Sequence, residues 1–344
     1  MLESIGSGHI HDTYLVSWKE REIPPLVLQR INTTVFRDVE LLMQNLEILT
    51  SHIADKNRKA GLDPAQNGIL LLEAEEGKSW VGNEDYGFWR MFWFIEDQCS
   101  FEFAADVKTA EEGGRAIGAF QKMLLDLNPE LIGDTIPDFH NLNSRILQFE
   151  SSLSSANSLR LQKAEQYIED AQENFDRFVD IYEVSAREGF PVRLTHNDTK
   201  FNNILFSKTG KATCLIDLDT VMKGYSWVDF GDALRTSAST ASEEEKDLEK
   251  IDFRLDIFES FAKGYLSEAG NFLLPGEIKI LHRIPELFAF MQGLRFLTDY
   301  LSGDPYYKIH EPEQNLARAI NQFKLAEAIR EKESEMNKII RRIS

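Results

Sequence analysis

The stretch of sequence that decides the fold is residues 194–232, LTHNDTKFNNILFSKTGKATCLIDLDTVMKGYSWVDFGD. Two short apolar runs, Ile204–Phe206 and Cys214–Ile216, lie on either side of the polar segment Lys208–Lys211, which contains a glycine. Apolar runs separated by a short glycine-containing turn predict a β-hairpin. We therefore expect a loop, a strand, a turn and a second strand, in this order.

Polar side chains lie at both open ends of this predicted hairpin. Asp198 and Asn203 come before the first strand, and Asp217 and Asp219 follow the second. Because a hairpin returns the chain to its starting point, we expect these side chains to lie close together. Carboxylate and amide oxygens are the ligands that Mg²⁺ prefers, and Mg²⁺ on a nucleotide phosphate needs few protein ligands. The pattern thus predicts a magnesium and nucleotide site.

The same spacing resembles the catalytic loop of kinases, in which an aspartate accepts the proton of the substrate hydroxyl and a later asparagine holds a metal ion. Asp198, two residues after His196, corresponds to that aspartate. Asn203 corresponds to the asparagine, and Asp217 to the metal-binding aspartate that follows a hairpin in kinases. Each fragment alone favours a turn or a strand end with solvated carboxylates. Their order, with a hairpin between them, favours phosphoryl transfer with ATP and Mg²⁺ as cofactors.

Length and composition fit a cytoplasmic enzyme of two lobes. The chain has 344 residues and a formal net charge of −19, without a basic tract, so we expect no nucleic-acid and no membrane partner. Cys99 and Cys214 lack the spacing of a zinc site or a disulfide framework. The amino terminus lacks the pattern of a secretion signal. The longest apolar stretch, Pro285–Leu301, is interrupted by charged residues, which argues against a membrane span.

The first predicted nucleotide contacts lie close to the amino terminus. Gly6, Ser7 and Gly8 precede an alternating apolar stretch, as in a glycine-containing turn that enters a strand. Such a turn can place backbone amides over phosphates. A tight hairpin explains the two glycines equally well, and only residues 1–4 precede the turn.

A second strand is predicted at Pro24–Ile31, where Gln29 and Arg30 occupy the place of the phosphate-binding lysine of kinases. Arg30 could supply a charge and Gln29 a hydrogen bond, and the strand register decides which of them faces the nucleotide. The apolar spacing over Asp38–Ile53 predicts a helix. On this helix, Glu47 is either the partner of a strand cation or a solvated carboxylate.

Two further strands are predicted, at Gly68–Leu72 and at Phe88–Ile95. The second is rich in aromatic and β-branched residues, which favour strands. The chain continues into Ile95 and Glu96, whose backbone would form the hinge that hydrogen-bonds an adenine.

Downstream of residue 96 the patterns are mostly helical. His140 lies in a predicted loop, where it either reaches a substrate or has the commoner structural role. In a helix that begins at Trp227, Asp229 or Asp232 can bond the backbone amides of the catalytic loop. One amphipathic helix is expected over residues 315–344.

Together these elements predict an α+β, bilobal protein-kinase-like fold. Residues 1–95 would form a small β-rich lobe that binds the nucleotide. Residues 96–344 would form a large, mostly helical lobe with the catalytic and acceptor sites. We expect a monomer or a weak homodimer.

The chain also resembles a narrower family, the N-acetylhexosamine 1-kinases, which are bacterial members of the aminoglycoside-phosphotransferase-like superfamily. The strings NTT, DLDT and RFLTDYL carry this narrower resemblance. The matching segments follow the order of the chain: GSGHIHDTYLV (6–16), LQRINTTVF (28–36), THNDTKFNNIL (195–205), IDLDTVM (216–222), DFGDALR (229–235), GLRFLTDYLSGDPYY (293–307) and EQNLARA (313–319).

This resemblance implies a reaction. The γ-phosphoryl group of ATP would pass to the anomeric hydroxyl of N-acetylglucosamine or N-acetylgalactosamine. Asp198 would meet that hydroxyl, and Asn203 and Asp217 would hold Mg²⁺. The absence of a strand lysine is shared with the family.

The resemblance also implies an acceptor site. Thr220, Arg295 and Tyr306 correspond to the positions that contact the sugar in the family. An arginine can donate several fixed hydrogen bonds to hydroxyls or to an acetamido carbonyl. The spacing of four residues between Arg295 and Asp299 allows an alternative, a salt bridge along a helix.

Two other functions fit the same residues. The first is another small-molecule kinase of the superfamily, acting on a different sugar or on an amino alcohol. The second is a nucleotide-binding regulator without catalysis, which the absent strand lysine favours. The presence of Asp198 together with Asn203 and Asp217 argues against the regulator, because binding alone needs no catalytic base.

Overall fold

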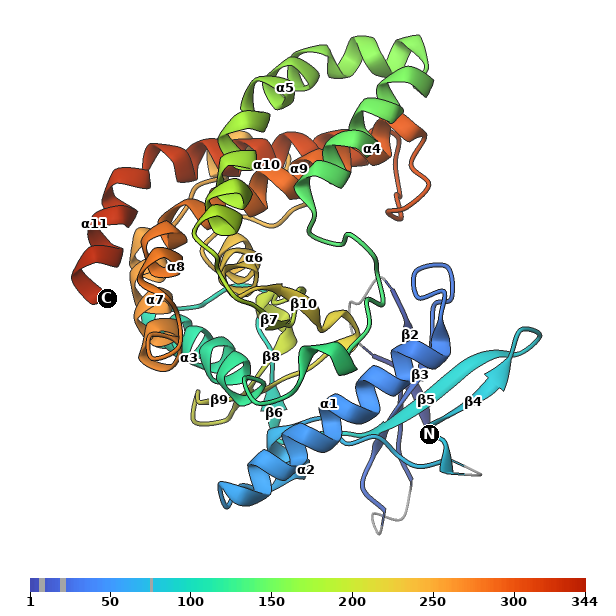
Figure 1. Cartoon of the computed structure of the whole chain (residues 1–344). Helices are drawn as coiled ribbons and strands as arrows, with labels where there is room; N and C mark the ends of the chain where they lie inside the picture. The colour runs from blue at the N-terminus through green and yellow to red at the C-terminus, as the bar shows by residue number, and fades with distance from the viewer. Residues whose placement is uncertain (6–9, 19–22, 75–76) are drawn as a thin grey trace.

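The computed structural model describes residues 1–5, 10–18, 23–74 and 77–344, and it has two lobes (Figure 1). The N-terminal lobe contains a five-stranded sheet in the order β1-β2-β3-β5-β4. The rest of the chain is mostly helical, which confirms the predicted α+β, bilobal fold. The predicted boundary between residues 95 and 96 falls in the segment that leads from the sheet to the helical lobe.

The sheet of the N-terminal lobe is antiparallel throughout. Its register places Gln29 of one strand opposite Arg90 of the next. The prediction of a strand around Gln29 and of another from residue 88 is confirmed. The strands are β1 (Leu2–Ser4), β2 (Asp12–Val16), β3 (Leu26–Arg30), β4 (Trp80–Asn83) and β5 (Gly87–Trp93).

One prediction for this lobe needs correction. Gly68–Leu72 is not a strand: only Leu71 forms an isolated bridge, to Phe92, because the segment meets β5 through a few hydrogen bonds and then turns away. Before the predicted glycine turn, β1 pairs with β2 from Leu2 opposite Val16.

The helix α1 (Val39–Lys59) packs against the sheet and extends beyond the predicted end at residue 53. Asp38 caps it by accepting a hydrogen bond from the backbone N–H of Leu41. Its apolar face includes Leu42 and Leu49, which are fully buried. The short helix α2 (Pro64–Asn67) follows.

The catalytic stretch forms two small sheets within the helical lobe. One has the strand order β6-β8-β9 and the other pairs β7 with β10. The predicted hairpin is confirmed as β8 and β9, and the loop with Asp198 lies between β7 and β8. The bounds are β6 (Gln98–Cys99), β7 (Val192–Thr195), β8 (Ile204–Ser207), β9 (Ala212–Leu215) and β10 (Met222–Tyr225).

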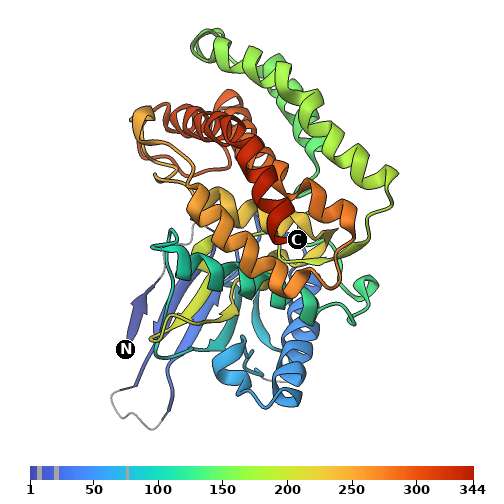
Figure 2. The same ribbon diagram turned by 90° about the vertical axis from the view of Figure 1, so that its left-hand side faces the viewer.

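The helices surround these strands, and the α4–α5 pair extends away from the N-terminal lobe (Figures 1 and 2). The expected single helix over 315–344 is interrupted at Lys332. The helices are α3 (Val107–Met123), α4 (Leu142–Ser155), α5 (Ser158–Arg187), α6 (Trp227–Ser237), α7 (Leu255–Ala269), α8 (Pro275–Ile280), α9 (Ile284–Ser302), α10 (Gln314–Glu331) and α11 (Glu333–Ile343).

Close packing of α3 against α7 places α3 beneath the catalytic loop. A Cβ atom added to Gly264 would lie 1.9 Å from the carbonyl oxygen of Glu111, and one added to Gly114 would lie 2.1 Å from that of Phe261. Neither position accommodates a side chain, so the two backbones approach directly. Of the helices that the structure describes, none combines the length and apolar character needed to cross a membrane.

Candidate active site

The backbone of the catalytic loop is held by Asp229 at the start of α6. Its carboxylate accepts hydrogen bonds from the backbone N–H groups of His196 (3.0 Å) and Asn197 (2.9 Å). Gln121 of α3 donates to the same carboxylate at 2.8 Å. Asn197 has a positive φ of 65°, which few residues other than glycine adopt. The predicted positioning role is therefore confirmed for Asp229.

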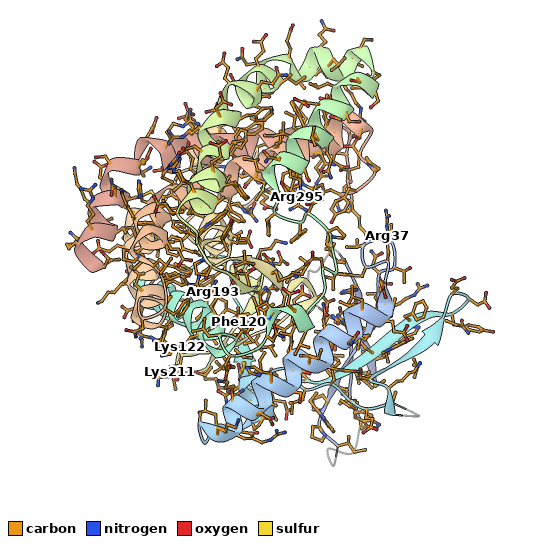
Figure 3. The ribbon with its side chains drawn as sticks, in the orientation of Figure 1. Arg37, Phe120, Lys122, Arg193, Lys211 and Arg295 are labelled. Atoms are coloured by element: carbon orange, nitrogen blue, oxygen red, sulfur yellow. The ribbon has the colours of Figure 1, made fainter. Side chains whose placement is uncertain are left out.

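His196 connects the catalytic loop with the strand that precedes Asp217. Its Nε2 lies 2.9 Å from the carbonyl oxygen of Ile216, and its Nδ1 accepts a hydrogen bond from the N–H of Asp198 at 3.3 Å. These contacts place the ring proton on Nε2. The ring packs edge-on against Phe120 of α3, which is labelled in Figure 3. His196 thus fixes the backbone of Asp198.

The carboxylate of Asp198 lies between a cation and an amide. Lys200 approaches it to 3.2 Å, and the side-chain nitrogen of Asn203 donates to it at 3.3 Å and to its backbone carbonyl at 2.8 Å. Burial would raise the pKa of Asp198, but the charge of Lys200 holds it below the ordinary value. The group is therefore a carboxylate at neutral pH and can accept a proton.

The hairpin places Asn203 beside Asp217, because Ile216 donates its N–H to the carbonyl of Asn203 at 2.9 Å. Asp217 has a φ of 63° and precedes a 3₁₀ turn, Leu218–Thr220. Loss of hydration within the protein raises the pKa of the Asp217 carboxyl, and the negative charges of Asp219 and Asp198 raise it further. Crowded carboxylates next to an amide suit a cation, so these residues fit Mg²⁺.

Within the described ranges, no three His, Cys, Asp or Glu side chains form a metal-binding group by themselves. A magnesium ion that accompanies a nucleotide takes only one or two carboxylates from the protein and completes its shell with phosphates and water. The metal assignment of Asn203 and Asp217 stays a prediction.

Several predicted nucleotide contacts can be located. Gly6, Ser7 and Gly8 lie outside the described residues. In the described part of the chain, the backbone groups of Ile95 and Glu96 form no hydrogen bond, and their contact with an adenine stays a prediction.

The register of β3 separates Gln29 from Arg30. The side chain of Gln29 faces the helical lobe, where its Oε1 accepts two hydrogen bonds from Arg90. Arg30 points to the other face and lines a groove of about 930 Å³ that also contains Arg37 and Lys308. Gln29 therefore occupies the position of the kinase lysine without supplying a charge.

Thr220 lies beneath the catalytic loop. Its hydroxyl donates to the carbonyl oxygen of His196 at 2.8 Å, and the residue is buried. In this arrangement Thr220 supports the loop from the side of Asp217. Its contact with a sugar stays a prediction.

Arg295 lies on the side of the helical lobe that faces the N-terminal lobe, across from Arg37 (Figure 3). It donates to Gln292 at 3.1 Å, and its guanidinium lies 5.3 Å from the ring centre of Phe139 and 5.8 Å from that of Tyr307. Asp198 is among the charges that act on it. The structure thus places Arg295 against the segment of Phe139 and His140, and His140 contacts the catalytic loop.

The alternative of a salt bridge between Arg295 and Asp299 is wrong. Asp299 instead accepts the backbone N–H groups of Tyr306 (2.9 Å) and Tyr307 (3.0 Å), because the chain turns back over the end of α9. Tyr306 itself is half exposed, and its ring packs on Tyr307. Its role as a sugar contact stays a prediction.

Residues 2–258, about three quarters of the chain, match the family described as "Phosphotransferase enzyme family". The chain belongs to this phosphotransferase family. The matched range includes the complete stretch from Asp198 to Asp229.

Solved structures show the same fold for this phosphotransferase at low sequence identity. An ethanolamine kinase from Plasmodium vivax is 14% identical, with a TM-score of 0.59 over 94% of this chain and 82% of its own. A microcompartment-associated aminopropanol kinase is 16% identical, with a TM-score of 0.60 over 98% and 93%. A spectinomycin phosphotransferase in complex with ADP and spectinomycin is 10% identical, with a TM-score of 0.59 over 97% and 93%.

The structure groups three residues around Arg295 that sequence reasoning left undecided or missed. His140 contacts the catalytic loop, with Nε2 2.6 Å from the carbonyl oxygen of Asn197. Arg145 donates to the carbonyl of Phe139 at 2.6 Å. Tyr307, rather than its neighbour Tyr306, packs by Arg295. Only His140 carried a signal in the sequence, as a histidine in a loop.

Two buried nitrogen atoms of this group have no hydrogen-bond partner within the described residues, namely Nδ1 of His140 and Nε of Arg145. Burial lowers the pKa of His140 to about 3, and the charges of Arg295 and Arg145 contribute. Burial and the charge of Arg295 likewise lower the pKa of Arg145 to about 10. His140 is therefore neutral and offers an acceptor, whereas Arg145 offers a donor.

Proposed function

We propose that this phosphotransferase transfers the γ-phosphoryl group of ATP to the anomeric hydroxyl of N-acetylglucosamine or N-acetylgalactosamine. Family membership supports the phosphoryl transfer. The neighbour solved with ADP supports a nucleotide as the donor. The similarity of the sequence to the N-acetylhexosamine 1-kinases supports the sugar.

The single observation that carries the choice of acceptor is the environment of Arg295. Its guanidinium is held by Gln292 and by two aromatic rings, and it has the carboxylate of Asp198 within electrostatic reach. The donors that remain can bond hydroxyl or carbonyl oxygens of a neutral acceptor. Arg145 adds a second positive charge. Such surroundings repel a cationic amino alcohol and favour a neutral sugar.

The choice of an N-acetylated sugar over the free hexosamine rests on the sequence resemblance. Nδ1 of His140 and Nε of Arg145 lack a hydrogen-bond partner among the described residues, but both atoms are buried, so a ligand reaches them only if the surrounding side chains move.

In the proposed mechanism, Asp198 accepts the proton of the anomeric hydroxyl while His196 and Asp229 keep its backbone in place. The ring oxygen withdraws electron density from the anomeric centre, so that hydroxyl gives up its proton more readily than a primary hydroxyl. A carboxylate is a weak base and is better matched to the more acidic hydroxyl.

Asn203 and Asp217 would hold Mg²⁺, which supplies neutralisation of the charge on the transferring phosphates. The backbone of Ile95 and Glu96 would bind the adenine. Positioning and charge account for most of such a reaction, so no covalent phosphoenzyme is needed.

An acceptor panel tests the proposal. The chain is incubated with ATP and Mg²⁺ and with N-acetylglucosamine, N-acetylgalactosamine, glucosamine or ethanolamine, and ADP formation is coupled to an optical readout. We expect turnover with the two N-acetylated sugars only. Turnover with ethanolamine instead would establish the amino-alcohol kinase, and ATP binding without turnover on any alcohol would favour the regulator.

Phosphorus NMR of the product tests which hydroxyl reacts. A sugar 1-phosphate shows coupling of the phosphorus to the single anomeric proton, and the mixture loses reducing power in proportion to ADP. Coupling to two methylene protons would identify a 6-kinase and would contradict the assignments of Thr220, Arg295 and Tyr306.

A further inference from the structure

In kinases an ion pair between a strand lysine and a helix glutamate, both in the N-terminal lobe, must be in place for activity. Gln29 lies on the predicted lysine strand, β3, and carries no charge. Glu47 of α1 accepts a hydrogen bond from the hydroxyl of Ser79. Gln29 and Glu47 therefore do not form that ion pair here.

Arg90 of β5 links the two lobes. Its two terminal nitrogens donate to the two carboxylate oxygens of Asp219 at 2.8 and 2.6 Å. Its Nε and Nη2 donate to Oε1 of Gln29 at 3.1 and 2.9 Å, and Nη1 reaches the sulfur of Met43 at 3.9 Å. The side chains of Arg90 and Asp219 are each 2% exposed. Strands β3 and β5 and helix α1 thus each contribute a side chain that contacts Asp219 or its partner Arg90.

A second residue of the N-terminal lobe holds the same carboxylate. Nε2 of His11 lies 2.6 Å from Asp219, and its Nδ1 accepts the N–H of Asn32, so the ring donates to the carboxylate. The ring also stacks on Phe36 with the centroids 5.3 Å apart. On the other side, the hydroxyl of Thr135 donates to the carbonyl of Asp219 at 2.7 Å.

Because Asp219 is close in the chain to Asp217, the contacts of Asp219 also affect the proposed metal site. Asp217 lies two residues earlier, and Asp219 is inside the single 3₁₀ turn that Asp217 begins. A displacement of the Asp219 side chain therefore moves Asp217. A buried ion pair contributes little net stability compared with an apolar pair, but it requires one relative geometry of its partners.

We infer that Arg90 and Asp219, with Gln29 and His11, form the clamp that couples the N-terminal lobe to the metal-binding loop and so positions Asp217. In this arrangement Arg90 is a positioning residue and makes no contact with the substrate. The inference rests on the metal role proposed for Asp217, but it is independent of the identity of the acceptor.

Nucleotide binding tests the clamp without measuring turnover. The dissociation constant of ADP is measured by calorimetry with and without Mg²⁺, and the ratio of the two constants gives the metal linkage. We expect the double variant Arg90→Met/Asp219→Asn to fold, because it leaves no uncompensated buried charge. Its metal linkage should fall roughly ten-fold, within the range of typical coupling between sites.

Two further variants keep the test decisive. Arg90→Lys retains the charge but loses the fork that binds both carboxylate oxygens, so it should fold and lose part of the linkage. Arg177→Met is the control, since Arg177 also binds a buried carboxylate with two nitrogens, here Nε and Nη2 to Glu286, but inside the helical lobe. It should keep the full linkage. Full linkage in the double variant would overturn the clamp.

Asp217→Ala separates this inference from the proposed metal site. If Asp217→Ala loses the metal linkage while the double variant keeps it, the metal assignment holds and the clamp is wrong. If Asp217→Ala keeps the linkage, the metal assignment itself fails, and the clamp inference fails with it. Thermal unfolding of each variant confirms that a folded protein was measured.

Discussion

Two arginines near the reaction centre are held in different ways. Among the described residues, Arg90 has a hydrogen-bond partner for each of its nitrogens, in Gln29, Asp219 and the sulfur of Met43. Arg295 has one such partner, Gln292, and otherwise lies against aromatic rings. A guanidinium carries five N–H groups, so the first has no donor left for a ligand and the second has several.

The difference separates two roles of a cation in one active site. Arg90 acts between protein groups and determines where the loop with Asp217 lies. Arg295 keeps unused donors toward the acceptor side. The number of engaged donors, rather than burial or charge alone, therefore distinguishes an arginine that positions the protein from one that binds a substrate.

The largest expected effect concerns the proposed catalytic base, Asp198. Asp198→Asn keeps the shape of the side chain but cannot accept a proton, so turnover should fall by about 10²–10⁴-fold while ADP binding persists. Steady-state kinetics and calorimetry on the same preparation measure the two effects. Near-normal turnover would remove Asp198 from the role of base.

The second largest effect is on the free energy of unfolding, and it should distinguish Arg90 from Arg295. Arg90→Ala leaves the buried Asp219 without its main partner, which typically costs about 3–5 kcal/mol in the free energy of unfolding. Arg295→Ala removes one hydrogen bond and a contact with two rings, and we expect a loss of about 1 kcal/mol. Urea denaturation of both variants measures the difference. Equal losses in the free energy of unfolding would contradict the different roles of Arg90 and Arg295.

Sequence reasoning found the residues that are close together along the chain. Asp198, Asn203 and Asp217 were predictable because one short hairpin determines their separation. The bond from α6 to the catalytic loop followed from the same local logic, and the structure assigns it to Asp229 rather than Asp232. The fold class was predictable because β patterns are concentrated before residue 95 and helical patterns after it.

Contacts that depend on tertiary packing were missed. Arg90 and Asp219 are 129 positions apart, and nothing in the spacing of either residue indicates the pair. The choice between Gln29 and Arg30 depended on the pleat of β3, which a shift of one residue reverses. Arg145 sits beside Arg295 because α4 packs against α9, and its surrounding sequence resembles any solvated helix.

A smaller effect tests the acceptor side by itself. Arg295→Ala should raise the KM for N-acetylglucosamine by about ten-fold or more while the KM for ATP stays within about two-fold, because the lost hydrogen bonds belong to the acceptor. Arg160→Ala is the control, since Arg160 also lies over a ring, that of Tyr300, but pairs with Asp304 away from Asp198. An equal change in the KM values for ATP and for N-acetylglucosamine would contradict the assignment of Arg295 to the acceptor site.

The smallest expected effect is a dependence of stability on pH that originates at His140. Burial lowers its pKa from 6.5 to about 3 in the folded chain, with contributions from the charges of Arg295 and Arg145. Between these two values the unfolded chain takes up a proton that the folded chain does not. The unfolded state is therefore favoured as the pH falls below 6.5, and this loss of stability is complete near pH 3.

His140→Gln should remove that dependence, because the glutamine amide can still donate to the carbonyl of Asn197 and has no proton to take up in this range. Over pH 6.5 to 5, the variant should lose roughly 1–2 kcal/mol less of its free energy of unfolding than the parent does. The same substitution at the exposed His310 serves as the control for a general effect of histidine removal. Parallel stability curves for the parent and His140→Gln would show that His140 takes up its proton at the same pH in the folded and in the unfolded chain. Below pH 6.5 it would then add a third positive charge beside Arg145 and Arg295.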